Sequence, residues 1–312
     1  MQSQNSRSVL DTIGNTPVVK LKHMAPPSSA DVLVKLEYIS PTGSYKDRLA
    51  LAMITGAEAR GVLKAGMRVV EYTGGSTGSS LAMVCAVKGY DFTAVTSDAF
   101  SGEKLATMRA LGAELNIIPS DHGKITPELF DVMLGEVGRL AKEPGNFYTD
   151  QFHNQDAIGA YMPIGRELLE QVGRDFDVFC GSVGTGGMLV GVSRALRSAN
   201  CRTRIVALEP ASSPLLSMGK GGPHRIEGIG AGFWPPHLER ADFDEVRPIE
   251  ERTARETARR LAREEGIFAG TSTGLNVAAA LELALELGAG HSVVTVAVDT
   301  GLKYLAGDLF SA

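Results

Sequence analysis

The stretch Pro41-Thr42-Gly43-Ser44-Tyr45-Lys46-Asp47-Arg48 decides how the rest of the chain is interpreted. It lies between an apolar, β-branched run at 32–36, which predicts a strand, and the segment 49–60, which predicts a helix. A proline and a glycine supply the turn. Lys46 therefore stands at a strand-to-helix junction, where a side chain can face a cleft. Its amine is either a solvated surface charge or, if its surroundings favour the neutral form, a nucleophile that forms a Schiff base.

Short apolar runs alternate with helical stretches along the whole chain. Several of the runs lack the strict alternation of half-exposed strands, so they predict a largely parallel sheet that is covered on both faces. One helix is expected to begin at Pro127, with Thr126 as its N-cap. Another follows Glu251, where Thr253 and Glu256 fit a capping box unless the helix begins earlier. The predicted strands are 32–36, 68–72, 92–95, 115–118, 178–180, 205–208 and 293–298.

Length and composition limit the class of protein. A chain of 312 residues suits two domains or one large α/β unit. The net charge of −5 gives no reason to expect nucleic acid or an anionic membrane as a partner. The first residues are polar with no apolar run behind them, and no stretch approaches the roughly 20 apolar residues of a membrane span. We therefore expect neither a signal peptide nor a membrane segment, and residence in the cytoplasm.

The cysteines and histidines show no metal-binding pattern. The three cysteines, Cys85, Cys180 and Cys201, form no CxxC pair. Cys85 and Cys180 lie in apolar runs, so we expect them to be buried as small hydrophobic residues. The sequence predicts neither a metal site nor a disulfide framework.

Two Gly-rich turns have the composition of anion-binding sites. Thr73-Gly74-Gly75-Ser76-Thr77-Gly78-Ser79-Ser80 follows the predicted strand 68–72, and Gly184-Thr185-Gly186-Gly187-Met188 follows 178–180. Each opens a helix, and amide groups at a helix start bind carboxylate or phosphate groups. The second turn lacks the third glycine of a dinucleotide fingerprint, since Leu189 stands in its place, and it suits a single phosphate monoester. The first turn on its own is equally compatible with an ordinary strand–turn–helix corner.

Taken together, these segments resemble the cysteine synthase and cystathionine β-synthase family of pyridoxal-phosphate (PLP) enzymes, fold type II. The resemblance runs from about Val9 to Leu305. Five segments carry it in the family's order and spacing: Ile13-Gly14-Asn15-Thr16-Pro17, Pro41 to Arg48, Gly184 to Gly187, Gly228-Ile229-Gly230-Ala231-Gly232-Phe233 and Gly270-Thr271-Ser272-Thr273-Gly274.

The resemblance implies two three-layer α/β domains with mostly parallel sheets, as in the tryptophan synthase β-like fold, with PLP in the cleft between them. The smaller, substrate-side domain is expected at 39–146. The larger, PLP-anchoring domain is expected at 1–38 and 147–312, with the segment 14–38 crossing over to join it. The resemblance also implies a homodimer, with the C-terminal tail of a serine acetyltransferase as a possible partner.

The family's residue roles carry over to matching positions in this sequence. Lys46 is the Schiff-base lysine, the phosphate is held by the second Gly-rich turn, and Ser272 faces the pyridine nitrogen, although it can also be a helix cap. The substrate carboxylate is bound by the first turn and by Gln151, and Gly228 lines the cleft mouth. The implied cofactor-binding residues are Lys46, Ser76, Gly184, Thr185, Gly186, Gly187, Met188 and Ser272, and the implied substrate-binding residues are Thr73, Gly74, Gly75, Ser76, Thr77, Gln151 and Gly228.

Three positions depart from the family pattern. Ser76 replaces an Asn that bonds the PLP ring hydroxyl, Gly74 replaces a Ser, and Met188 replaces a Thr in the phosphate turn. Ser76 is shorter than Asn, so a water is expected to bridge the gap. Gly74 is expected to open space beside the substrate's β-carbon and thereby to admit a bulkier or more charged leaving group than acetate, such as phosphate.

The implied reaction is β-replacement on an activated L-serine, first of all O-acetyl-L-serine and sulfide giving L-cysteine and acetate. O-phosphoserine as the donor remains open, as do homocysteine, thiosulfate or an amine as the nucleophile. Serine or threonine dehydration is a different outcome of the same chemistry. A non-catalytic paralogue that binds a partner's C-terminal peptide is a different class, which the intact Lys46 argues against.

Overall fold

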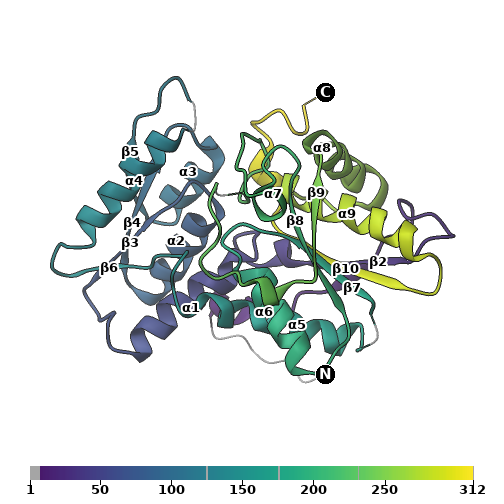
Figure 1. The fold of residues 1–312 in the computed structure, drawn as a ribbon. Helices are drawn as coiled ribbons and strands as arrows, with labels where there is room; N and C mark the ends of the chain where they lie inside the picture. Colours follow the sequence, from purple (N-terminus) through teal and green to yellow (C-terminus); the bar gives the residue numbers. More distant parts are fainter. Residues whose placement is uncertain (1–7, 124–125, 175, 231, 312) are drawn as a thin grey trace. The chain divides into compact units, whose positions relative to one another are not determined.

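The chain folds into two compact units in a computed structural model that describes residues 8–123, 126–174, 176–230 and 232–311 (Figure 1). The first unit comprises the residues up to Ile13 together with Ser40–Ala157. The second unit comprises Gly14–Ile39 and Ile158–Ala312. Each unit contains its own sheet, so the fold is α/β with mostly parallel strands, as predicted.

The first unit is built on a four-stranded parallel sheet with the strand order β5-β4-β3-β6. Strand β4 is buried at every position after Asp91, so the sheet is covered on both faces. Leu129, Met133 and Val137 of helix α4 pack on its core. The elements are η1 (Val9–Thr12), α1 (Lys46–Ala59), β3 (Arg68–Tyr72), α2 (Ser76–Lys88), β4 (Asp91–Ser97), α3 (Gly102–Ala110), β5 (Glu114–Ile118), α4 (Pro127–Leu140) and β6 (Asn146–Tyr148).

The second unit is built on a six-stranded sheet with the order β1-β2-β10-β7-β8-β9. Only the β1–β2 pair is antiparallel. Its elements are β1 (Val18–Lys20), β2 (Asp31–Leu36), η2 (Glu37–Ile39), α5 (Ala157–Gln171), β7 (Val178–Ser182), α6 (Gly187–Ser198), β8 (Arg204–Pro210), α7 (Leu215–Met218), η3 (Arg240–Asp242), β9 (Glu245–Ile249), α8 (Glu251–Arg260), η4 (Leu261–Glu265), α9 (Thr271–Leu287), β10 (Ser292–Ala297) and η5 (Gly301–Tyr304).

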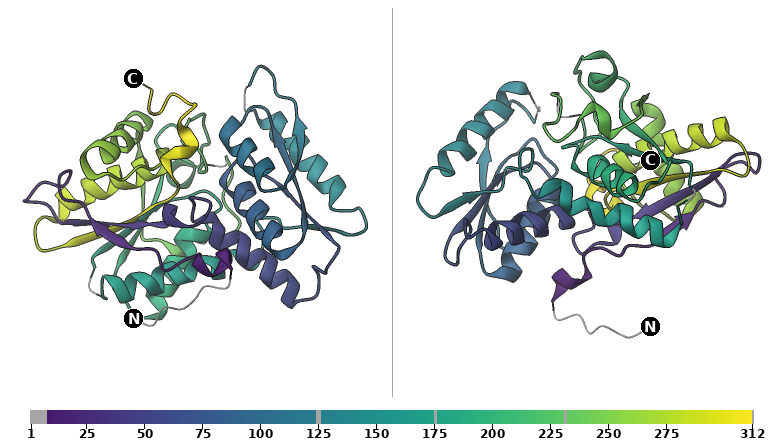
Figure 2. Two further views of the ribbon diagram at one scale, coloured as in Figure 1. Left: turned by 180° about the vertical axis from the view of Figure 1, so that it is seen from behind. Right: turned by 60° about the horizontal axis from the view of Figure 1, so that its bottom comes forward.

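The early strands lie in the sheet of the late residues. Strand β2 runs parallel to β10, with Asp31 opposite Ser292 and Leu36 opposite Ala297. Figure 2 shows this purple segment alongside the yellow end of the chain. Side chains of β2, β7, β8, β10 and α9 share one core cluster, so the early strands are an integral part of the second unit.

The division into units differs from the expected boundaries at 38/39 and 146/147. The second boundary comes later, at 157/158, because β6 adds a strand to the first sheet by pairing with β3. The residues that follow β6 are also tied to β3, since Thr149 Oγ1 and the Gln151 amide donate to the Glu71 carboxylate. Of the N-terminal stretch, the residues up to Ile13 group with the first unit, and residues 1–7 lie outside the described part.

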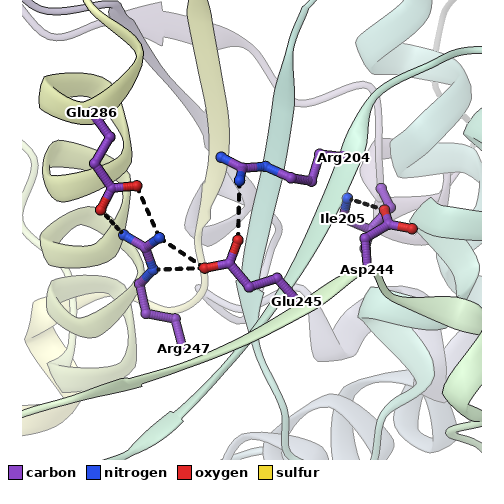
Figure 3. A network of polar contacts seen from close by, with 6 residues as sticks. All are labelled: Arg204, Ile205, Asp244, Glu245, Arg247 and Glu286. Atoms are coloured by element: carbon purple, nitrogen blue, oxygen red, sulfur yellow. Dashed lines mark hydrogen bonds and ion pairs between the residues drawn. The ribbon is translucent and has the colours of Figure 1, made fainter.

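Strand β9 forms the edge of the second sheet and is held there by charge pairs (Figure 3). Arg247 bonds Glu245 of its own strand at 2.7 Å and Glu286 of α9 at 2.7 Å. Glu245 also pairs with Arg204 of β8 at 3.1 Å. Pro248 has no backbone N–H group to donate to a neighbouring strand, and such a residue is tolerated in an edge strand.

Two further expectations from composition can be compared with the structure. Cys85 and Cys180 are buried, and burial raises the pKa of each thiol to about 12, so both are inert apolar side chains. Within the described residues, no helix combines the length and the apolar character needed to cross a membrane.

Candidate active site

Lys46 is the first residue of α1, and its side chain is only 8 % exposed. Among the described residues its Nζ has no hydrogen-bond or ion-pair partner, and the ring centroid of Tyr45 lies 5.2 Å away. Burial lowers the pKa of Lys46 to about 8, although the nearby Glu71 carboxylate acts in the opposite direction. The amine is therefore partly neutral near neutral pH, which is the form that attacks a carbonyl group.

Lys35 provides an internal comparison, because it is fully buried yet engaged. Its Nζ pairs with Glu167 at 2.8 Å and donates to Thr16 O at 2.7 Å and to Gln171 Oε1 at 3.0 Å. These partners use all three donors of an ammonium group. Lys35 is therefore a structural cation, and the structure distinguishes it from Lys46.

The turn that carries Lys46 is fixed to the first Gly-rich turn through Asp47. The Asp47 carboxylate is fully buried and accepts from the Thr42 amide at 2.8 Å and from Ser80 Oγ at 2.6 Å. Ser80 lies in α2, which follows the turn, and its hydroxyl also donates to Ser76 O at 2.9 Å. The lysine segment and the first Gly-rich turn are thus neighbours within the first unit.

The first turn is organised by two threonine hydroxyls. Thr73 Oγ1 accepts from the amides of Gly75 and Gly78, each at 3.2 Å. Thr77 Oγ1 donates to Gln151 Oε1 at 2.8 Å, so the structure brings Gln151 to this turn, as the resemblance implies. Because α2 begins at Ser76, the turn lies at a helix start, a place whose backbone amides attract an anion. The arrangement suits a carboxylate.

Glu71 is a site residue that the sequence analysis missed. It is fully buried at the end of β3, and its carboxylate accepts from Thr149 Oγ1 at 2.5 Å and from the Gln151 amide at 3.1 Å. Burial raises the pKa of Glu71 to about 8. The hydrogen bond from the Gln151 backbone amide positions Gln151. The charge of Glu71 also acts to raise the pKa of Lys46. The sequence did contain a signal for this residue, because Glu71 is a carboxylate within an apolar strand directly before a Gly-rich turn.

In the second unit, the turn Gly184–Met188 has the geometry of a phosphate cradle. Gly186 has a left-handed backbone, with φ of 84°, and α6 begins at the next residue. A Cβ at Gly184 would clash with the carbonyl oxygen of Gly228, so the two loops are in direct contact. Thr185 is buried, and its hydroxyl has no hydrogen-bond partner among the described residues.

The Met188 side chain turns away from this cradle. Its Cε lies 2.7 Å from the point where a Cβ at Gly181 would be, so the side chain occupies space that this glycine leaves in β7. Only the backbone amide of Met188 is therefore available to a ligand at the turn.

Ser272 is the second residue of α9 and is 2 % exposed. Gly270 is the N-cap, so Ser272 is not the helix cap, and its hydroxyl has no partner among the described residues. The preceding Thr271 accepts from the Glu227 amide at 3.3 Å, which places the start of α9 beside Gly228. Asp299 supports the same corner, since its backbone oxygen accepts from the Gly270 amide at 3.1 Å. Ala231 of the adjoining Gly-rich segment lies outside the described residues.

These groups fit PLP in kind. A buried amine of lowered pKa suits its aldehyde, and a helix start with a left-handed glycine suits its phosphate. A buried hydroxyl without a protein partner suits a neutral ring nitrogen.

Comparisons with known proteins agree with this fit. A family model described as "Pyridoxal-phosphate dependent enzyme" matches residues 9–299. A cysteine synthase of Staphylococcus aureus is 42 % identical over 306 residues, which is 97 % of each chain. An O-ureido-L-serine synthase of Streptomyces lavendulae is 41 % identical over 97 % of this chain and 92 % of its own. The crystal structure of O-acetylserine sulfhydrylase isoform 3 from Entamoeba histolytica is 33 % identical, with a TM-score of 0.92 over 100 % of this chain and 93 % of its own. The chain therefore belongs to the family of pyridoxal-phosphate-dependent enzymes, and within it to the cysteine synthase and cystathionine β-synthase group of β-replacement enzymes.

Proposed function

We propose that this protein makes L-cysteine and acetate from O-acetyl-L-serine and sulfide by β-replacement. The observation that carries the proposal is the buried Lys46 amine, whose pKa is lowered to about 8. It lies in a segment that Asp47 ties to a carboxylate-binding turn. An amine that is neutral near physiological pH, next to a site for an amino acid's carboxylate, can remove that amino acid's α-proton.

The cofactor, when bound, supplies the electron withdrawal that makes the α-proton of the amino acid acidic. Lys46 Nζ would hold the cofactor's aldehyde, and the free Lys46 amine would be the base that takes the donor's α-proton. Thr73 and Thr77, the amides of Gly74, Gly75 and Ser76, and Gln151 would hold the donor's carboxylate, which would orient its β-substituent for departure. The Gly75 amide, which donates to Thr73 Oγ1 in the structure, would exchange this partner for the carboxylate.

The remaining residues anchor the cofactor in this proposal. The amides of Gly184, Gly186, Gly187 and Met188 and the Thr185 hydroxyl bind the phosphate. The Ser272 hydroxyl would hold the pyridine nitrogen, and a hydroxyl at that place would leave the nitrogen unprotonated. Ser76 reaches the ring hydroxyl through a water, and Gly228 lines the entrance.

Another nucleophile is the second candidate. A relative 41 % identical to this chain is an O-ureido-L-serine synthase, so a nucleophile other than sulfide remains open, among them an amine, thiosulfate and homocysteine. O-phosphoserine remains an alternative donor, and dehydration of serine or threonine an alternative outcome. By analogy with the family, we place the protein in the cytoplasm as a homodimer that can bind the C-terminal tail of a serine acetyltransferase.

The test uses the purified, PLP-loaded protein. O-acetylserine, O-phosphoserine and serine are supplied in turn, each with sulfide, thiosulfate, homocysteine or an amine, and the products are identified by mass spectrometry. O-acetylserine with sulfide should give L-cysteine fastest, and Lys46→Ala should give none. Pyruvate and ammonia as the main products would instead identify a dehydratase, and no product from any pair would refute the proposal.

A further inference from the structure

We propose that Phe100 limits the size and charge of the donor substrate, because its ring occupies the space that a side chain at position 74 would need. This inference rests on the proposed function, in which the Thr73–Gly78 turn binds the donor's carboxylate. Phe100 lies in the loop between β4 and α3, outside every segment that the family resemblance identified.

The contact between Gly74 and Phe100 is direct. A Cβ built at Gly74 would lie 2.5 Å from Cδ1 and 2.6 Å from Cζ of Phe100, closer than any real Cβ contact. The expectation that Gly74 opens space beside the substrate's β-carbon is therefore wrong. The missing side chain leaves no empty volume, since an aromatic ring fills it.

The same pattern continues along the turn. Lys104 and Met108 lie four residues apart on one face of α3, and Phe100 lies four residues before Lys104 in the loop that leads into this helix. A Cβ at Gly75 would lie 3.4 Å from Lys104 Cδ, and one at Gly78 would overlap Met108 Sδ. Each glycine of the turn thus lies against one side chain of the stripe that Phe100, Lys104 and Met108 form. Phe100 is the side chain that lies against the first glycine, Gly74.

Phe100 is held in place but is not enclosed. Its amide donates to Ser97 O at 3.3 Å, and its ring packs on the core cluster that contains Tyr72 and Val95. The side chain is only half-buried, so part of an apolar ring is left beside the carboxylate-binding turn. A phosphate dianion against this ring loses hydration that an apolar surface cannot replace, whereas an acetyl ester loses little. The cation of the stripe, Lys104, approaches Gly75, where its Nζ lies 3.7 Å from the position of a Cβ. The contact between Gly74 and Phe100 therefore favours O-acylated serine over O-phosphoserine as the donor.

The activity test compares Phe100→Ala with the wild type on O-acetylserine and O-phosphoserine. We expect kcat/KM for O-phosphoserine to rise relative to O-acetylserine by on the order of tenfold, as when a pocket wall is removed. Leu140→Ala is the matched control, because Leu140 packs on the same core cluster but lies in α4, and it should leave the ratio unchanged. Phe100→Leu replaces the alanine variant if the latter does not fold.

A double-mutant cycle measured by thermal unfolding of the cofactor-free protein provides a readout independent of activity. Gly74→Ser should lower Tm in the wild-type background, and most of that loss should disappear when Phe100 is alanine. An equal loss in both backgrounds, or a Phe100→Ala enzyme whose donor ratio is unchanged, would overturn the inference. A wild-type protein that uses no donor refutes the proposed function instead, and the two failures are distinguishable.

Discussion

The pKa of Lys46 makes the reactivity of a single residue measurable. In the folded chain the pKa is about 8, below its ordinary value of 10.5, so the fraction of neutral amine rises with pH, reaches half near pH 8 and levels off roughly one pH unit above that midpoint. The rate at which cofactor-free protein captures PLP should follow this curve. Stopped-flow absorbance across the pH range measures it, and a rate that still climbs steeply near pH 10 would mean that Lys46 is solvated.

Glu71 provides a second residue-scale prediction. Its carboxylate raises the pKa of Lys46, so Glu71→Gln should move the midpoint of the capture curve to lower pH. Glu143→Gln is the control, because Glu143 is an exposed residue whose carboxylate pairs with Arg139 of α4 and accepts from Asn146 Nδ2. A midpoint that stays in place would show that Glu71 acts only by positioning Gln151.

Ser272 tests the electronics of the cofactor site. Ser272→Asp places a carboxylate where the ring nitrogen is proposed to lie, so it should protonate the ring and slow β-replacement by orders of magnitude, each tenfold being about 1.4 kcal/mol of barrier. The absorption spectrum of the bound cofactor should change as well, whereas Ser272→Ala should preserve it. Full activity and an unaltered spectrum in the Ser272→Asp variant would show that Ser272 does not contact the ring nitrogen.

Residues differ in how far sequence alone reveals them. Lys46 and Ser272 stand in local motifs, so their roles could be inferred from the order of residues around them. The contact between Phe100 and Gly74 could not be found in this way, because the two residues follow the strands β4 and β3 and meet only when these strands pair. The same contact explains why the interpretation of Gly74 as open space was wrong. The presence of a glycine in a sequence does not indicate which other side chain occupies the space beside it.

At the scale of elements, all seven predicted strands are present, but three of the four strands at the sheet edges, β1, β6 and β9, were not predicted. Strand β5 is the edge strand that was predicted, at 115–118. Strands such as β7 are continuous apolar runs, which is a local signal. Strands β1 and β6 are three residues long, and β9 carries charges and a proline, so they read as loops. The helix at Pro127 begins as expected, with Thr126 Oγ1 accepting from the Leu129 amide at 3.3 Å. Helix α8 begins at Glu251, so the capping box at Thr253 is accidental.

Two loops that meet backbone to backbone give an element-scale prediction. Gly184→Ala would drive a methyl group into the Gly228 carbonyl, so it should separate the phosphate turn from its neighbour. We expect a loss of about 1–3 kcal/mol in the free energy of unfolding and at least about tenfold weaker PLP binding. Chemical denaturation and a cofactor titration measure these effects.

Gly159→Ala is the matched control for this substitution. Gly159 lies in α5 of the same unit, and no atom comes within 4 Å of a Cβ built there. Alanine should therefore stabilise the helix by about 0.5–1 kcal/mol and leave PLP affinity unchanged. Equal PLP affinity in the Gly184→Ala and Gly159→Ala proteins would contradict the proposal that the Gly184–Met188 turn binds the phosphate of PLP.

At the scale of the whole molecule, each unit has its own sheet and core, but the chain visits them in an order that periodicity cannot reveal. Strand β2 has the same apolar character as β3, yet the two belong to different sheets. Only long-range pairing, here of β2 with β10, assigns a strand to its sheet. The family resemblance suggested the crossing, and composition and spacing alone did not.

The identity of the lysine that binds PLP tests the central claim most directly. The PLP-loaded protein is reduced with borohydride, digested and mapped by mass spectrometry. The pyridoxyl group should be found on the peptide that contains Lys46, and Lys46→Ala should bind some PLP without fixing it covalently. A pyridoxyl group on Lys35 or Lys104 would contradict the assignment of Lys46 and the mechanism built on it.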